Sequence, residues 1–259
     1  MNQSFIDLVT TEIRKFEFPL NVYAEVLRLH TGSVDYLHYG LFESATEDVL
    51  TAQERSNRWL FNHLPKSSCS VLEIGIGLGA TLNRLHQMGF TVHGITPDQA
   101  QARIAKARNP TVTLTTCTFE SFANPTRYDI LLFQESSQYI ASPILWQQTD
   151  ALLTASGKVL ILDEFKKQGD GGLQARETFL AEAASRGFHL TEEVDFSRQA
   201  AFTVEFLLNT VSQHQAQLLA LPGVDQAMLN GLEASLRTYQ KNYANGSYGY
   251  FWMAFARDD

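Results

Sequence analysis

Short apolar segments alternate with helix-like segments over residues 70–196, and this alternation constrains the fold more than any other feature of the chain. The strand-like segments are 70–76, 90–95, 111–117, 128–136, 158–165 and 188–196. The helix-like segments between them are 79–89, 97–108, 144–157 and 174–187. This order is typical of strand–helix–strand units around a parallel sheet. We therefore predict an α/β fold with a Rossmann-like, doubly wound sheet.

The two ends of the chain are different. Residues 1 to about 30 predict two helices interrupted near Pro19, the aromatic stretch 35–44 predicts a packed loop, and residues 46–64 predict a helix that stops at Pro65. Two further helices are expected at 200–221 and 225–244, before a last, aromatic strand at 247–257 that completes seven strands. We expect an N-terminal part (1–64), a core (65–198 and 246–259) and a helical lid (199–245).

Composition narrows the functional class. The chain has 259 residues, 44% of them hydrophobic and 19% charged, which suits a globular protein with a sizeable core. Its net charge of −8 argues against nonspecific nucleic-acid binding, which depends on neutralising phosphates. Cys69 and Cys117 form neither a disulfide framework nor a zinc cluster. Without an apolar signal region or a membrane-length apolar run, the expectation is a soluble, cytoplasmic protein.

The stretch VLEIGIGLGA (71–80) places Gly75, Gly77 and Gly79 directly after the first strand. Glycine inside an element costs about 0.5–1 kcal/mol relative to alanine, so we expect a ligand at this loop. The spacing is G-x-G-x-G, and Ala80 stands where a dinucleotide-binding G-x-G-x-x-G has glycine. A phosphate-binding P-loop is excluded because G-K-[ST] is missing. Glu73 could anchor the loop or orient a cationic amino group of the ligand.

The sequence VLEIGIGLG resembles the first motif of class I S-adenosylmethionine-dependent methyltransferases. The resemblance extends over about residues 36–257, although only the glycine motif is specific. GITPDQAQ (94–101) resembles the second-strand exit of the branch that contains cyclopropane fatty acid synthases and sterol-type methyltransferases. In that branch, Thr96 and Gln101 would hold the cofactor, with Asp98 as a rival for the ribose hydroxyls.

Further segments resemble the same branch, with departures. YLHYGLFES (36–44) resembles the aromatic segment over the methionine end of the cofactor, and SYGYFW resembles the last strand. The third-strand exit lacks the aspartate that contacts adenine, so Thr118 and Phe119 would take that place. Gln138 and Tyr139 replace a Glu-His pair, which counts against cyclopropanation. The resemblance implies that the cofactor-binding residues are Tyr36, Tyr39, Glu73, Gly75, Gly77, Gly79, Thr96, Gln101, Thr118, Phe119 and Gln134.

We predict methyl transfer from S-adenosylmethionine to a small acceptor at O, N or C, as in secondary metabolism. Such a transfer needs alignment and exclusion of water, with a base only where the acceptor loses a proton. The candidate bases are Glu135, His38, Asp163 and Glu164, and Tyr39 and Tyr139 could face the sulfonium through cation–π attraction. Phe202, Phe206, Phe251 and Trp252 hint at an apolar or aromatic acceptor.

Two alternatives stay open from the sequence. One is an NAD-dependent oxidoreductase, against which the glycine spacing argues. Another is a methyltransferase-like fold with a binding role or another reaction. A bound metal would need a third ligand beside Asp163 and Glu164, and no metal site is expected. No partner other than the small molecule is predicted, apart from a homodimer as an option.

Overall fold

The computed structural model describes residues 3–66 and 68–257. Seven strands form one sheet in the order β3-β2-β1-β4-β5-β7-β6. All neighbours are parallel except β7, which runs antiparallel to β5 and β6. The strands are β1 (Ser70–Ile74), β2 (Thr91–Thr96), β3 (Thr113–Thr116), β4 (Tyr128–Gln134), β5 (Leu153–Lys166), β6 (Phe188–Asp195) and β7 (Tyr248–Arg257). The predicted doubly wound, mostly parallel sheet is confirmed.

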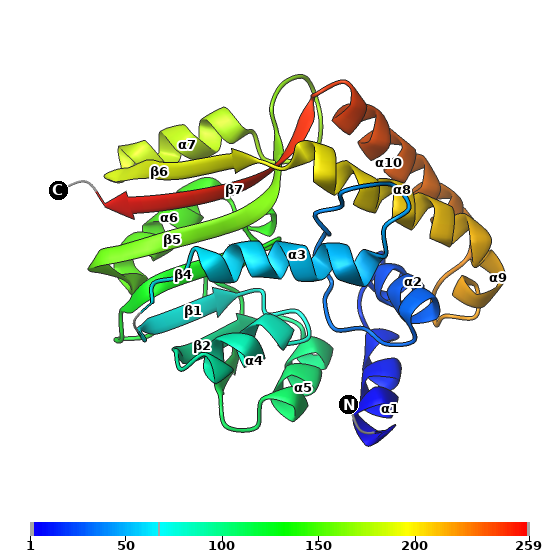
Figure 1. Cartoon of the computed structure of the whole chain (residues 1–259), viewed down its shortest axis with the longest axis horizontal. Coiled ribbons are helices and arrows are strands. Elements are labelled where there is room, and N and C mark those ends of the chain that lie inside the picture. The colour runs from blue at the N-terminus through cyan, green and yellow to red at the C-terminus, as the bar shows by residue number, and fades with distance from the viewer. Residues whose placement is uncertain (1–2, 67, 258–259) are drawn as a thin grey trace.

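Helices cover both faces of this sheet (Figure 1). One face carries α3 (Val49–Asn62), α4 (Ala80–Gln87) and α5 (Gln99–Arg108), and the other carries α6 (Ser142–Leu152) and α7 (Arg176–Ser185). Successive strand residues point to opposite faces, so the strands feed two cores. In β5, Leu160 and Leu162 join one core, while Val159 and Ile161 join the other. Burial on both faces explains the continuous apolar runs in the sequence.

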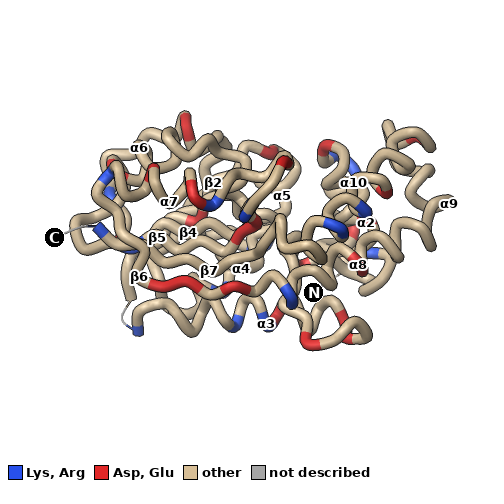
Figure 2. The backbone as a smooth tube through the Cα atoms, turned by 90° about the horizontal axis from the view of Figure 1, so that it is seen from above, with Lys and Arg blue, Asp and Glu red and all other residues tan. Residues whose placement is uncertain are grey.

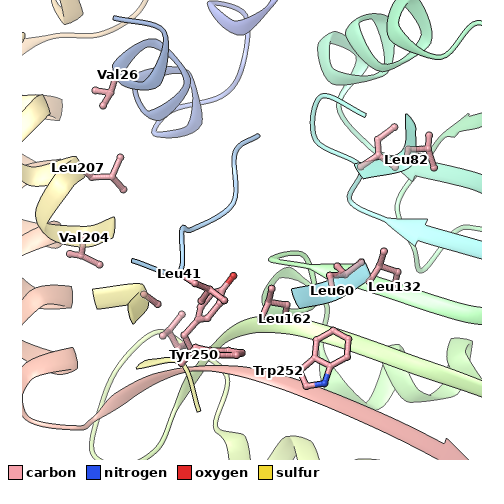
Figure 3. Close-up of a cluster of buried hydrophobic side chains, with 14 of the residues drawn as sticks. Val26, Leu41, Leu60, Leu82, Leu132, Leu162, Val204, Leu207, Tyr250 and Trp252 are labelled. Carbon is pink, nitrogen blue, oxygen red and sulfur yellow. The ribbon is translucent and has the colours of Figure 1, made fainter. Parts of the chain in front are cut away.

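The remaining helices gather beyond one end of the sheet (Figure 1). They are α1 (Gln3–Ile13), α2 (Leu20–Thr31), α8 (Ser197–Gln213), α9 (Gln215–Leu218) and α10 (Gln226–Ala244). One hydrophobic core extends from the sheet into this group, and Figure 3 shows it running from Leu132 and Leu162 to Leu207 and Val26. The amide of Gly40 also donates to Thr203 Oγ1 at 3.1 Å, which ties the aromatic segment to α8.

The structure corrects the predicted helix at 144–157. This helix ends at Leu152, because Leu153 already belongs to β5 and pairs with Tyr128 of β4. Strand pairing and complete burial of Leu153 thus override the local helical pattern. The predicted 200–221 helix also starts earlier, at Ser197, and breaks near His214.

The sheet edge at β6 carries acidic side chains, which Figure 2 shows as a red run along this strand. They are Glu192, Glu193 and Asp195. Charged residues on an edge strand discourage pairing with another chain. None of the helices within the described residues is long and apolar enough to span a membrane.

Candidate active site

A pocket of about 800 Å³ opens where the sheet order reverses, between β1 and β4. Its wall is formed by residues that end or follow β1, β2, β3 and β4, by the aromatic segment, and by the α1–α2 connection with the start of α2. In doubly wound sheets, ligands bind at this switch point, beyond the carboxyl ends of the strands. The position of the pocket therefore agrees with the expected ligand site at the glycine loop.

The glycine loop has positive φ at Gly75, Gly77 and Gly79, with angles of 77°, 50° and 71°. A Cβ on Gly75 would lie 2.5 Å from Ser136 Cβ, so close packing against the β4 exit requires glycine there. Gly77 is different, because a Cβ there would meet nothing nearer than Leu37 Cδ1 at 3.9 Å. Gly75 and Gly77 line the pocket, whereas Gly79 lies behind it at the N-terminus of α4.

The backbone amides of this loop are used unevenly. The Gly75 and Ile76 amides donate to Ile95 O of β2, at 2.9 Å and 3.3 Å. No hydrogen bond from the amides of Gly77 and Leu78 is found within residues 3–66 and 68–257. Unpaired amides at the start of a helix are suited to an anionic group.

Glu73 lies on β1, is 2% exposed and lines the pocket. Its Oε2 has no hydrogen-bond partner among the described residues. Burial raises the pKa of this carboxyl to about 8. Leaving a buried carboxyl oxygen unpaired is costly unless a ligand provides a donor. Glu73 is therefore suited to a cationic amino group, as its place before the glycines predicts.

The β2 exit holds Thr96, Asp98 and Gln101 on the pocket wall. Thr96 Oγ1 donates to Gln101 Oε1 at 2.9 Å and accepts from the Asp98 amide at 3.2 Å. Asp98 Oδ1 caps α5 by accepting from the amides of Ala100 and Gln101 at 2.7 Å and 2.9 Å. The Thr96 hydroxyl is therefore used as both donor and acceptor. Asp98 Oδ2 and Gln101 Nε2 form no hydrogen bond with the described residues.

In the aromatic segment, Tyr36 and His38 line the pocket and Tyr39 does not. The Tyr36 hydroxyl donates to Glu54 Oε1 at 2.9 Å. His38 is 8% exposed, and burial lowers its pKa to about 4, so its ring is neutral at physiological pH. The Tyr39 ring stacks on Tyr250 of β7, with centroids 5.8 Å apart and an angle of 8°.

Glu135 directly follows β4, lines the pocket and is partly buried. Its φ is 56°, the one positive value for a non-glycine residue in the described ranges. Its Oε1 accepts a 2.7 Å hydrogen bond from the Tyr250 hydroxyl and another from the Tyr39 amide. Loss of hydration and the nearby charges of Glu164 and Asp163 raise the pKa of this carboxyl. An unusual backbone conformation at a pocket wall is typical of functional sites.

The other candidate bases lie behind the wall. Asp163 is completely buried, and its Oδ2 accepts from the Ser137 hydroxyl at 2.7 Å and from the Gln138 amide at 3.2 Å. Glu164 accepts a 2.6 Å bond from the Tyr243 hydroxyl of α10. Neither residue lines the pocket, so neither can contact an acceptor there, contrary to the sequence interpretation. Across the described residues, no three acidic, His or Cys side chains group as metal ligands.

The remaining predicted residues also lie on the pocket wall. Tyr139 is 79% exposed and lines the pocket beside Glu135. Thr118 and Phe119 line it at the β3 exit, and Phe119 also packs edge-on against Phe133, with centroids 5.4 Å apart. Gln134 lines it too, but its amide group is engaged by Thr81 and Asn57 at 3.0 Å and 3.1 Å.

The lining of the pocket differs from two expectations about its surroundings. Among the described residues, none from α8–α10 lines this pocket, so its wall gives no support to the predicted lid. Phe202, Phe206, Phe251 and Trp252 do not line it either, because they pack in the cores. The connection between α1 and α2 and the start of α2 form part of the pocket wall instead. Their lining residues, which the sequence analysis did not predict, are Lys15, Glu17, Phe18, Pro19, Leu20 and Tyr23.

Solved structures share this architecture. The chain superposes on the [4+2]-cyclase SpnF with a TM-score of 0.77 and 18% identity, covering 92% of this chain and 94% of that one. The cyclopropane synthase MmaA2 from Mycobacterium tuberculosis superposes with a TM-score of 0.78 and 15% sequence identity, covering 99% of both chains. An O-methyltransferase of Brevibacillus brevis in complex with S-adenosyl-L-homocysteine superposes with a TM-score of 0.69 and 18% sequence identity. The match covers 87% of this chain and 85% of that one. The chain has the fold of class I S-adenosylmethionine-dependent methyltransferases.

A sequence relative agrees with this class. An uncharacterized methyltransferase of Bacillus cereus is 30% identical over 128 residues, which are 48% of this chain and 58% of that protein. The chain thus matches only a little over half the length of the relative. No protein-family model matches the chain. The resemblance to class I methyltransferases, inferred from the glycine motif, is confirmed by the relatives and the fold together.

Proposed function

We propose that the protein transfers a methyl group from S-adenosylmethionine to a small acceptor in this pocket. The observation that carries the proposal is that one pocket holds a buried carboxyl oxygen and two loop amides that have no hydrogen-bond partner among the described residues. They belong to Glu73, Gly77 and Leu78. The amino-acid end of the cofactor carries an ammonium and a carboxylate, which complement these groups.

The ribose and the adenine of the cofactor are assigned to other residues of the pocket wall. Asp98 Oδ2 and Gln101 Nε2 would hold the ribose hydroxyls, and Thr96 would fix the amide of Gln101. Thr118 and Phe119 would flank the adenine. When bound, the cofactor supplies a methyl group already activated on a sulfonium sulfur. The protein then needs to align the acceptor and keep water out.

The acceptor would bind toward Phe18, Leu20 and Tyr23, on the side of the pocket formed by the end of the α1–α2 connection and the start of α2. This wall is mainly apolar and aromatic, which favours a small apolar or aromatic acceptor. Glu135 is the favoured base because its Oε2 accepts none of the hydrogen bonds found in the described residues. His38 is a weaker base, since its pKa is about 4. Tyr139 would contact the acceptor or the sulfonium.

Calorimetry with S-adenosylmethionine and S-adenosylhomocysteine tests the proposal, followed by label transfer from methyl-labelled cofactor to a panel of phenols, alcohols and amines. Binding of both ligands and labelled product are the expected results. NAD serves as a competing ligand, since binding of NAD alone would favour an oxidoreductase. Binding of both cofactor forms without transfer to any acceptor would favour a non-methylating role. Absence of cofactor binding would refute the proposal.

A further inference from the structure

Glu135 stands directly beside the glycine loop. The next residue, Ser136, packs against Gly75, where an added Cβ would lie 2.5 Å from Ser136 Cβ. Ser136 Oγ also donates to Ile74 O at the end of β1, which fixes the β4 exit to this loop. A cofactor that lies along the glycine loop therefore lies against the wall that carries Glu135.

The Glu135 carboxyl is held through one oxygen. The Tyr250 hydroxyl and the Tyr39 amide both donate to Oε1, whereas none of the hydrogen bonds among the described residues ends on Oε2. Because Glu135 is partly exposed and lines the pocket, Oε2 is the oxygen left for a ligand. The carboxyl is thus oriented by the protein but remains free to interact with the pocket contents.

Negative and neutral groups surround this carboxyl. Asp163 and Glu164 of β5, Tyr250 of β7, Tyr39 of the aromatic segment and Tyr139 after β4 act on it. The basic side chains that line the pocket, Lys15 and Arg103, are paired with Glu12 at 2.6 Å and 2.7 Å. Burial and the like charges raise the pKa of Glu135, so the ligand-free protein keeps this carboxyl protonated over a wider pH range.

We propose that Glu135 is the counter-ion of the cofactor sulfonium and loses its proton to solvent when the charged donor binds. Neutral S-adenosylhomocysteine would leave that proton in place. The inference rests on the proposed function, because it requires the cofactor to occupy this pocket. It goes further because it names Glu135 as the group that compensates the sulfonium charge, and donor binding as the step at which the proton is released.

The proton balance closes over the whole cycle. Donor binding releases one proton from Glu135, which then has a free Oε2. As the sulfur–methyl bond breaks and the bond from methyl to the acceptor atom forms, the acceptor proton moves to this oxygen. The products are neutral S-adenosylhomocysteine, the methylated acceptor and protonated Glu135. The proton of the overall reaction therefore leaves at donor binding, and the residue returns to its starting state.

Calorimetry in buffers of different ionisation enthalpy counts the protons released by each ligand and needs no acceptor. In the pH range where the ligand-free protein keeps Glu135 protonated, the wild-type protein should release more protons with S-adenosylmethionine than with S-adenosylhomocysteine, by up to about one per site. In Glu135→Gln the two ligands should release equal numbers. Tyr248→Phe is the matched control, because Tyr248 does not line the pocket and does not contact Glu135, so the difference between the two ligands should persist.

The outcomes separate this inference from the proposed function. If neither ligand binds the wild-type protein, the proposed function fails. If both bind with equal proton release, or if the difference persists in Glu135→Gln, the role of Glu135 is overturned. The comparison of two ligands on the wild-type protein stands even if Glu135→Gln does not fold. Tyr250→Phe, which removes a donor to the carboxylate, should move the largest difference to higher pH.

Discussion

The Tyr250 hydroxyl donates a 2.7 Å hydrogen bond to Oε1 of Glu135, although 115 residues separate the two in sequence. Tyr250 lies on β7, the strand next to β5, and its ring stacks on Tyr39. This contact links the last strand, the aromatic segment and the exit of β4. It makes the geometry of a pocket carboxyl depend on three distant parts of the chain.

Replacing Tyr250 with Phe tests this contact. The substitution removes a hydrogen bond to a carboxylate, which is worth about 1.5–3 kcal/mol, so affinity for S-adenosylmethionine should fall roughly tenfold or more at neutral pH. Affinity for S-adenosylhomocysteine should change much less, because Glu135 stays protonated in that complex. Tyr248→Phe is the control, since Tyr248 lies two positions earlier in β7 and does not contact Glu135. Equal losses for both ligands in Tyr250→Phe would contradict the account.

Gly77→Ala separates backbone strain from ligand contact. The new methyl group would meet no atom nearer than Leu37 Cδ1 at 3.9 Å, but φ of 50° strains an L-residue by about 1–2 kcal/mol. Gly246→Ala is the control, because it also places an L-residue at positive φ, 75°, with nothing within 4 Å, and lies outside the pocket. Both variants should lose similar stability in urea unfolding, but only Gly77→Ala should weaken cofactor binding. Equal affinity of the two variants for the cofactor would show that the glycine loop does not contact it.

Asp98 is expected to have two functions that substitution can separate. Asp98→Asn keeps an N-cap acceptor for α5, so stability should be nearly unchanged while cofactor affinity falls. Asp98→Ala should lose affinity as well and about 1 kcal/mol of stability. Asp48→Ala is the control, because Asp48 caps α3 by accepting from the Thr51 amide at 3.0 Å and does not line the pocket. Unchanged affinity in Asp98→Asn would assign the ribose to other residues.

The stability of the ligand-free protein should depend on Glu73. Its pKa is about 8 in the folded state, against 4.5 as its ordinary value. The unfolded chain therefore loses this proton first as the pH rises, and stability falls between these two values. Glu73→Gln cannot ionise, so its free energy of unfolding should fall less from about pH 5 to about pH 8.5, by at least about 1 kcal/mol. Parallel pH profiles for the two proteins would show that Glu73 is not held protonated.

Much of the fold could be predicted from local patterns. Continuous apolar runs such as 128–134 identify strands buried on both faces, and the glycines after 70–74 place the first strand-to-helix turn. The regular alternation of strands and helices predicts a mostly parallel sheet, but it does not predict that β7 lies antiparallel between β5 and β6. The end of α6 could not be predicted, because Leu153 becomes a strand residue only through its pairing with Tyr128.

The site could be predicted only in part. Residues close to a strand exit, such as Glu73, Thr96 and Glu135, lie on the pocket wall as the topology requires. Asp163 and Glu164 also follow this pattern, yet neighbouring elements bury them behind the wall. Phe18 and Tyr23 were missed because their place depends on how α1 and α2 pack against the sheet, which no local signal encodes. The positive φ of Glu135 likewise has no signature in the sequence.

A crystal structure of the protein with S-adenosylhomocysteine tests the central claim most directly. The account predicts ligand along Gly75–Leu78, with its ammonium at Glu73 Oε2, its carboxylate at the amides of Gly77 and Leu78, and its ribose at Asp98 and Gln101. It also predicts open space between the sulfur and Tyr23 for an acceptor. A ligand bound elsewhere, or no ligand at millimolar concentration, would contradict the assignment of this pocket.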